Sequence, residues 1–314
     1  MRPVLRPGAA LLRRDRAHLQ LVVEPGQAIV LPDSPTVQDL LGRLDGLCAR
    51  DRVVASCRDA TQAAEVLDTL VAAGLVVDAD EVRAAHTPGE LVYLLTRGTA
   101  ADAARRLHRR AGATVGLLAG GERQESLLAA IGSLLTASGV GGLVTTDNVA
   151  AAVPPGSWRH RLPPSHPPPD VTVVVGAPVT SARTEALVLA DVPHLVVSVV
   201  DGVAVVGPFV RPGRTACVSC IDRVLAARDP AWPALLDQLR LSGPVAGGPA
   251  DLPVPRSPVL DAATTTLAAR EVLAHLAGEP VLTYDASLRF SADLVEQVLH
   301  RWHLHPDCGC CLLT

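Results

Sequence analysis

The chain has 314 residues, 48% of them hydrophobic and 2% aromatic, which is enough for two domains of ordinary size with separate cores. Its formal net charge of −4 argues against a general nucleic-acid binder, which would show a basic excess. The sequence contains no lysine, so it excludes a phosphate-binding loop of the Gly-x-x-x-x-Gly-Lys-[Ser/Thr] kind.

The N-terminal segment and the apolar stretches bear on location. Five arginines lie in the first sixteen residues, but the apolar run of a secretory signal does not follow them. The longest apolar stretches, such as Val171–Val175 and Leu195–Val200, are too short to span a bilayer. We therefore expect a soluble cytoplasmic protein that has no membrane partner. In that compartment, the seven cysteines indicate metal ligands or reactive thiols rather than disulfides.

Residues 1–90 are expected to form a first domain of short strands and two helices. The first helix opens at Ser34 and Pro35, which suit the N-cap and N1 positions, and the second opens at Asp59 and ends at Gly74. Two strands before these helices and one after them predict a winged helix-turn-helix, with another small α+β domain as the alternative. The expected strands are His18–Val23, Ala28–Leu31 and Leu75–Val77.

Residues 91–314 are expected to form a second, α/β domain, after a linker broken at Thr87-Pro88-Gly89. Strands and helices alternate from Thr99, which predicts a mostly parallel sheet with helices on its faces. Pro154 to Pro169 holds seven prolines and is expected to be an irregular loop. The expected strands are Thr114–Leu118, Gly142–Thr145, Val171–Val175 and Leu195–Val200, and the expected helices are Ala101–Arg110, Glu122–Ser138, Ser181–Ala190 and Asp261–Leu276.

Two cysteine clusters provide the most specific motif. Cys217 and Cys220 place two thiolates on one short turn, and Cys308, Cys310 and Cys311 follow near the chain end. Four thiolates suit a tetrahedral structural zinc ion with no open position for catalysis. The Cys-x-x-Cys spacing favours Cys311 as the fourth ligand, and Cys310 is its substitute. A redox dithiol is the alternative, and His303 and His305 are expected to be bystanders.

A nucleotide site has only partial support. Gly120 and Gly121 follow a predicted strand, where a phosphate would approach the next helix, but Glu122 comes directly after them and would repel it. Asp147 ends the following strand, where an acid can hold a ribose or a metal. The structural alternatives are a plain turn and a helix cap. Likewise, Asp201-Gly202 is expected to cap or solubilise a strand end.

From about Thr114 onward, the chain resembles the ThiF/MoeB-type adenylating domains related to ubiquitin-activating enzymes. The matching parts are the glycine turn, Asp147, the cysteine clusters, and Val200-Asp201-Gly202 running on to Gly207-Pro208-Phe209-Val210-Arg211-Pro212. Residues 1–90, from Arg6-Pro7-Gly8 through Leu75-Val76-Val77-Asp78, resemble winged-helix elements that bind leader peptides of ribosomally made natural products.

Together, the two parts resemble the partner protein of azole-forming cyclodehydratases, the TOMM or bacteriocin-biosynthesis cyclodehydratase family. The resemblance implies a Rossmann-like domain with a zinc knot, and a protein that grips the precursor peptide while a separate YcaO-type protein uses ATP. The chain departs from active adenylating members after Asp147, since Asn148 to Gly156 carries no arginine or glutamine at the matching spacing. Binding ATP without cationic partners is costly, so adenylation by this chain alone is not expected.

The first hypothesis is therefore a non-catalytic peptide-recognition and scaffold protein, which adds an extended peptide to a sheet edge near His18–Val23 and Ala28–Leu31. The alternative is a ThiF-type adenylyltransferase that uses ATP and magnesium, with Gly120, Gly121 and Asp147 in working roles. A third hypothesis, a DNA-binding regulator, is disfavoured because the helix from Asp59 to Gly74 carries no arginine. A homodimer through the helix Asp261–Leu276 is left open.

Overall fold

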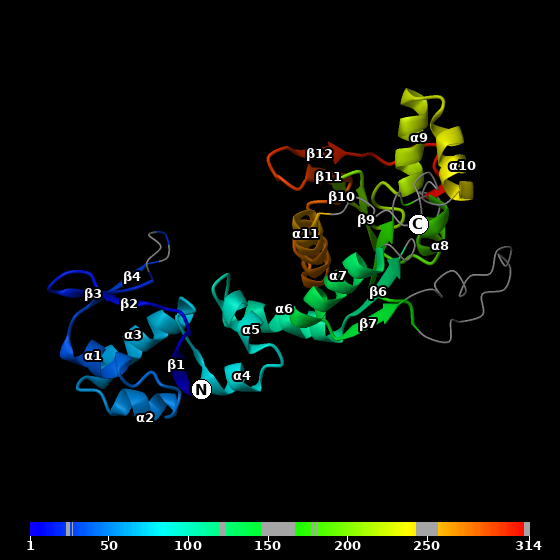
Figure 1. Cartoon of the computed structure of the whole chain (residues 1–314). Coiled ribbons are helices and arrows are strands. Elements are labelled where there is room, and N and C mark those ends of the chain that lie inside the picture. Colours follow the sequence, from blue (N-terminus) through cyan, green and yellow to red (C-terminus); the bar gives the residue numbers. More distant parts are fainter. Residues whose placement is uncertain are drawn as a thin grey trace. The chain divides into compact units, whose positions relative to one another are not determined.

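The computed structural model describes residues 1–22, 26, 28–119, 124–145, 167–176, 179, 181–242 and 257–310. The chain divides into two compact units, Met1–His108 and Arg109–Thr314, which are described separately below (Figure 1). Among the described residues, no helix has the length and apolar character needed to cross a membrane.

The unit Met1–His108 contains two small sheets and several short helices. One sheet pairs β1 with β5, and the other has three antiparallel strands in the order β2-β3-β4. Helix α6 (Ala100–Gly112) begins in this unit and ends in the next. The other elements are β1 (Pro3–Leu5), β2 (Leu11–Arg13), β3 (His18–Leu21), β4 (Ile29–Pro32), α1 (Pro35–Leu41), α2 (Arg50–Ala55), α3 (Ala60–Ala72), β5 (Val76–Asp78), α4 (Ala79–Ala84) and α5 (Pro88–Leu95).

The predicted helix starts in this unit are confirmed. The Ser34 side chain accepts a hydrogen bond from the backbone N–H of Val37, and Asp59 accepts one from Gln62. These side chains satisfy donors that have no partner inside the helix. Gly74 follows α3 with a φ of 67°, a left-handed conformation that suits glycine at a helix end.

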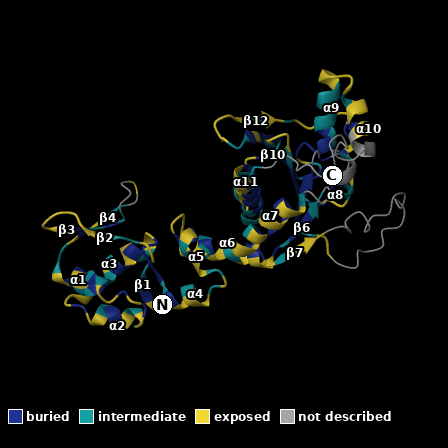
Figure 2. Cartoon of the chain, viewed as in Figure 1, coloured by how far each residue is buried: buried dark blue, intermediate teal, exposed yellow. Residues whose placement is uncertain are grey.

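One core holds the three-stranded sheet and its helices together. Inward-facing side chains of β3 and β4 meet the apolar faces of α1, α2 and α3, and Figure 2 shows this burial along the helices. The fully or almost fully buried members include Leu21, Leu31, Val37, Leu40, Val53, Leu67 and Leu70.

The predicted linker is wrong, because two helices occupy that region. Helix α4 is capped by Asp78, and α5 begins at Pro88, which is at N1 or N2 of the helix. Their apolar side chains join Val77 and Ala103 in a second small core, which buries Leu91, Leu94 and Leu95. Pro88 and Gly89 were interpreted as a break, but proline at the first helical turn costs no internal hydrogen bond.

The unit Arg109–Thr314 is built on a seven-stranded mixed sheet, in the order β12-β11-β10-β9-β8-β6-β7. β7, β6, β8 and β9 are parallel to one another, and β10, β11 and β12 extend the sheet with antiparallel pairs. The elements are β6 (Thr114–Ala119), α7 (Glu125–Ala137), β7 (Gly142–Thr145), β8 (Val171–Gly176), α8 (Ser181–Leu189), β9 (His194–Val200), β10 (Val203–Val210), α9 (Val218–Arg228), α10 (Trp232–Ser242), α11 (Pro258–Ala277), β11 (Ala286–Ser291) and β12 (Gln297–Arg301).

Helices cover both faces of this sheet. Val173 and Val175 of β8 pack with α7 and α11 in the largest core, whereas Val174 packs with Leu187 of α8 on the opposite face. This alternation follows from the period of two in a strand, and it explains why β8 is buried at every position. The prediction of a parallel sheet with helices on its faces is confirmed for the strands β6 to β9.

Candidate metal centre and open sheet edge

Cys217 and Cys220 lie at the start of α9, where the chain leaves β10. Cys217 is the N-cap residue, and Cys220 falls in the first helical turn. The backbone N–H of Ala216 donates to Asp285, and that of Trp302 donates to the Asp285 carbonyl. The segment before α9 is therefore tied to the region around β11 and β12, which leads to the chain end.

Cys308 and Cys310 reach the same place from the C-terminal segment that follows β12. All four sulfurs lie within 4.8 Å of one another, and all four residues are buried. Trp302, Val188, Val210 and Ala216 pack around them. These mainly apolar neighbours bury the four thiols.

The sulfur geometry fits one tetrahedral metal ion. The Sγ atom of Cys217 lies 3.7 Å from that of Cys220 and 3.6 Å from that of Cys308, and the Cys220 and Cys310 sulfurs are 3.5 Å apart. Four sulfurs at about 2.3 Å from a zinc ion would be about 3.8 Å from one another. A disulfide would require about 2.05 Å, so these four cysteines form no disulfide with one another. The residues present thus fit a zinc site with four cysteine ligands.

The electrostatics of the four cysteines favour capture of a cation. A hydrogen bond from Cys217 lowers the pKa of the Cys220 thiol, and the backbone N–H of His305 also donates to that sulfur. The hydrogen bond to Cys220, together with burial, raises the pKa of Cys217, and burial raises that of Cys310. The Cys220 thiolate is therefore stabilised next to two thiols, Cys217 and Cys310, that stay protonated. A divalent cation would stabilise all four as thiolates.

The structure places the substitute ligand, Cys310, in the cluster. Cys311 lies outside the described residues, so Cys217, Cys220, Cys308 and Cys310 are the four cysteines that the described structure brings together. His305 contributes its backbone N–H to Cys220, and its Nδ1 accepts from the N–H of Asp307. Among the described residues, the group of possible ligands that lie together contains cysteines alone.

The proposed nucleotide residues cannot be placed. Gly120, Gly121 and Asp147 all lie outside the described residues. The elements that lead to them, β6 and β7, are adjacent parallel strands. Gly116, inside β6, lies close to β8, since a Cβ there would approach the Thr172 hydroxyl oxygen to 2.7 Å. This glycine therefore has a packing role between strands.

Within the described part of the chain, β2 and β4 are the two outer strands of the sheet β2-β3-β4, and each has one open edge. β3 is hydrogen-bonded on both sides, so the predicted edge segment His18–Val23 forms the central strand, and only Ile29–Pro32 of the two predicted segments is an edge. The N–H of Asp33 donates to Ala17 across the β3–β4 pair. Because the direction of backbone groups alternates, the N–H and C=O of Val30 point away from β3. Among the described residues, no strand pairs with this outer edge of β4.

Comparison with solved structures finds this fold in larger heterocyclases. A heterocyclase solved with substrate and cofactor has a TM-score of 0.67 and 16% identity over 98% of this chain. The heterocyclase TruD has a TM-score of 0.65, also at 16% identity over 98% of this chain. The chain spans 39% and 42% of those two proteins, which is about two fifths of their length.

Escherichia coli MccB shares the fold over nearly its whole length. Its crystal structure has a TM-score of 0.52 and 12% identity, covering 99% of this chain and 97% of MccB. MccB with MccA and MccB with ATP each have a TM-score of 0.56 at 13% identity. No family model matches the chain, and no curated protein sequence matches it. At these identities the likeness is one of fold.

Proposed function

We propose that this chain is the peptide-recognition and scaffold protein of a cyclodehydratase system that forms azoles in ribosomally made peptides. Its winged-helix-like unit, Met1–His108, would hold the precursor peptide. The Rossmann-like unit, Arg109–Thr314, closed by a structural zinc, would dock a YcaO-type catalytic protein or segment. The fold shared with heterocyclases over 98% of the chain supports this proposal.

The observation that carries peptide recognition is the open edge of β4. Val30 is 44% exposed, and its outward N–H and C=O can pair with an added strand, while Leu31 is buried and anchors β4 in the core. Pro32 lacks an N–H, but its nitrogen would face outward, which is the position that a sheet edge tolerates. β2 has a free edge as well, but all of its residues are exposed, so it is anchored less firmly.

The chain matches only about two fifths of each heterocyclase, and this partial match supports the scaffold role. About three fifths of each heterocyclase lies beyond the match. We infer that a further segment or a separate protein supplies the part that corresponds to this remainder. The chain would contribute recognition and docking, and the ATP-dependent chemistry would belong to that other part.

The test has two steps: peptide ligands are selected, and a residue on the edge of β4 is then substituted. The full-length protein is used to select from a displayed library of random 20-residue peptides, and the affinity of an enriched peptide is measured by fluorescence anisotropy. Val30→Pro removes the outward N–H of β4 without touching its pairs with β3, so we expect affinity to fall about tenfold or more.

The matched control is Leu11→Pro in β2. By the same alternation, Leu11 points its N–H away from β3, because Arg14 and Ala10 make the inward bonds to His18 and Val22. This variant should bind the selected peptide within about twofold of the wild type if β4 is the binding edge. Equal losses in both variants, or no enriched peptide at all, would refute peptide addition at β4.

A second candidate, ATP-dependent adenylation, is favoured by one observation: MccB, with the same fold, has been solved with ATP. Gly120, Gly121 and Asp147 would then bind the nucleotide and magnesium. The absence of lysine from the sequence speaks against a tightly held triphosphate. We expect no magnesium-dependent pyrophosphate exchange by this chain alone. Exchange that is lost in Asp147→Ala would make adenylation the leading function.

A further inference from the structure

We propose that a pocket around Arg6, in the unit Met1–His108, binds a carboxylate, and that this carboxylate is an acidic side chain of the recognised peptide. The peptide as carrier rests on the function proposed above, whereas the carboxylate site rests on the pocket itself. No residue of this pocket belongs to the metal cluster or to the edge of β4.

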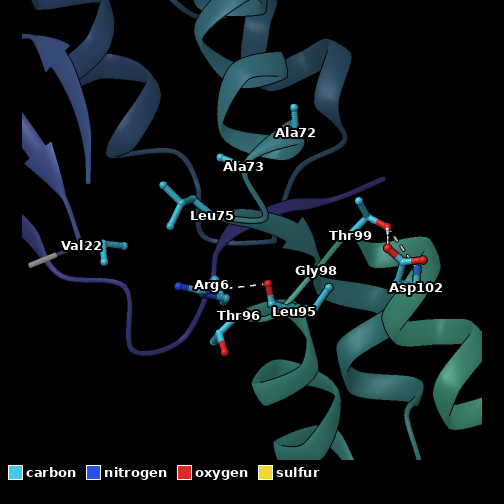
Figure 3. A pocket seen from close by; sticks show the side chains of 10 residues that line it. All are labelled: Arg6, Val22, Ala72, Ala73, Leu75, Leu95, Thr96, Gly98, Thr99 and Asp102. Carbon is cyan, nitrogen blue, oxygen red and sulfur yellow. Dashed lines mark hydrogen bonds between the residues drawn. The ribbon is translucent and has the colours of Figure 1, made fainter. Parts of the chain in front are cut away.

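The pocket has a volume of about 430 Å³, within the range of small-ligand sites. Its wall combines apolar side chains from the end of β3, the end of α3 and the end of α5 with polar groups at the start of α6 (Figure 3). The lining residues that matter here are Arg6, Val22, Leu75, Leu95, Thr99 and Asp102. Such a space accepts one side chain or a small molecule.

Arg6 is the unusual member of this wall. Its residue is only 8% exposed, and its guanidinium makes one long hydrogen bond, 3.4 Å from NH1 to the carbonyl of Leu95. Within the described part of the chain, Nε has no hydrogen-bond partner and no carboxylate pairs with the guanidinium. Arginine stays protonated in proteins, and a buried charge without a partner is costly. An anion that enters the pocket would relieve this cost.

Asp102, the acidic residue among the described residues of the wall, is already engaged. Asp102 accepts hydrogen bonds from the Thr99 hydroxyl and pairs with Arg105 at the start of α6, and its own backbone N–H donates to the Thr99 hydroxyl oxygen. The Thr96 hydroxyl donates to the carbonyl of Tyr93. Arg6 is thus the group left to bind an anion. One guanidinium matches one planar carboxylate by paired N–H donors. Asp102 lines the same wall, and its charge repels a doubly charged phosphate more strongly than a singly charged carboxylate.

The pocket wall includes Val22, which follows β3, the strand next to the edge that would receive a peptide. Val22 follows directly after Leu21, and Leu21 pairs with Ile29, the first residue of β4. Val22 has a φ of 70° and donates its N–H to Ala10, so the chain turns at this point. Leu21 pairs with Ile29, so we infer that a peptide strand leaving the Ile29 end of β4 runs on toward the pocket wall. An acidic side chain a few residues along that peptide can reach Arg6.

The experiment is a double-mutant cycle on the full-length chain. Each acidic residue of the selected peptide is changed to its amide, and affinities are measured for the wild type and for Arg6→Met. A charge-assisted hydrogen bond predicts a loss of about tenfold for one peptide position with the wild type and about twofold or less with Arg6→Met. Arg58→Met, an exposed arginine paired with Asp39, should behave as the wild type. Additive losses at every peptide position overturn the proposal.

Two further measurements test the carboxylate site at Arg6 separately from the proposal that a peptide supplies the carboxylate. If Arg6 serves binding, replacing its buried charge should not destabilise the protein, so Arg6→Met should melt at the same temperature as the ligand-free wild type or higher. A lower melting temperature would indicate a structural role instead. Glutarate should shift the Arg6 Nε–H resonance in ¹H–¹⁵N spectra, and inorganic phosphate should not. A glutarate shift without any peptide binding would keep the site and refute the proposed function, and no shift would refute the site.

Discussion

Removing one ligand of the cysteine cluster should destabilise the unit Arg109–Thr314 strongly. In Cys220→Ser, a bound ion loses a thiolate, and the connection between α9 and the C-terminal segment is weakened. That connection joins Cys217 to Cys308, which are 91 residues apart. A crosslink across a loop of that size is worth about 5 kcal/mol by the loop-closure estimate, and whole domains are stable by roughly 5–15 kcal/mol.

The expected shift in melting temperature follows from the size of the unit. A domain of roughly 200 residues shifts by about 2–4 °C for each kcal/mol, so Cys220→Ser should lower the melting temperature of this unit by about 10–20 °C. Scanning calorimetry measures it, with the transition of Met1–His108 as an internal reference. Elemental analysis should show about one zinc per chain in the wild type and a large loss in the variant.

Three other cysteine changes make the test specific. Cys48→Ser, outside the cluster, should keep both the zinc and the melting temperature. Cys310→Ser should behave as Cys220→Ser, and Cys311→Ser should behave as the wild type, because the described structure places Cys310 with the other ligands. A wild-type protein without metal, or a Cys220→Ser variant with an unchanged transition, would refute the structural zinc.

The remaining predictions concern one buried base and one glycine of the same unit. Burial lowers the pKa of His194 to about 4, so as pH falls below about 6.5 the unfolded chain binds a proton first and stability is lost, by roughly 2 kcal/mol at pH 5. Urea unfolding should show that the free energy of unfolding of the wild type falls between pH 7.5 and pH 5.0. In His194→Gln this fall should be smaller by about 2 kcal/mol. Equal falls in the two proteins would contradict the prediction. Gly207 has a φ of 102°, and a Cβ there would meet the Ala286 carbonyl at 2.5 Å. Gly207→Ala should therefore cost about 2–4 kcal/mol in urea unfolding, against about 1 kcal/mol for Gly202→Ala, which has a φ of 77° but open space; similar costs would refute the clash.

Local chemistry made some elements predictable from sequence. Ser34 and Asp59 are capping residues followed by apolar positions at helical spacing, and both helices start where these residues predict. The strands β6, β8 and β9 are short apolar runs that are buried on both faces, and such runs can be recognised directly in the sequence. These features depend on residues close together in the chain.

The antiparallel half of the large sheet was missed although the signal was present. The sequence analysis predicts a strand-end cap at Asp201-Gly202. In the structure these two residues form the turn of a hairpin that joins β9 to β10. The φ angle is 50° at Asp201 and 77° at Gly202. An Asp-Gly pair between two β-branched runs is a strong hairpin signal, because both residues tolerate positive φ. β11 and β12 had no comparable signal, since β11 pairs with β10, which lies far away in sequence.

The residues of the proposed sites show where sequence reasoning ends. The Cys-x-x-Cys spacing favours Cys311, which lies outside the described residues, and the described structure brings Cys310 to the cluster. The positions of the ligands depend on how the segment after β12 meets α9, and that is a long-range contact. The sequence predicts no binding role for Arg6, because its neighbours in the pocket wall come from distant segments, including Leu95 at the end of α5 and Asp102 in α6. A side chain's burial and missing partners are properties of packing, and no local pattern reports them.

The open edge of β4 illustrates the same limit for the backbone. Sequence located both His18–Val23 and Ala28–Leu31 as strands, but an edge is defined by pairing, and β3 uses the alternating N–H and C=O groups of its two sides on β2 and β4. The register then assigns direction: because Asp33 bonds inward to Ala17, Val30 must face outward. A shift of one residue would turn Leu31 outward and remove it from the core. The burial of Leu31 therefore stabilises the register that leaves Val30 free to pair with a peptide.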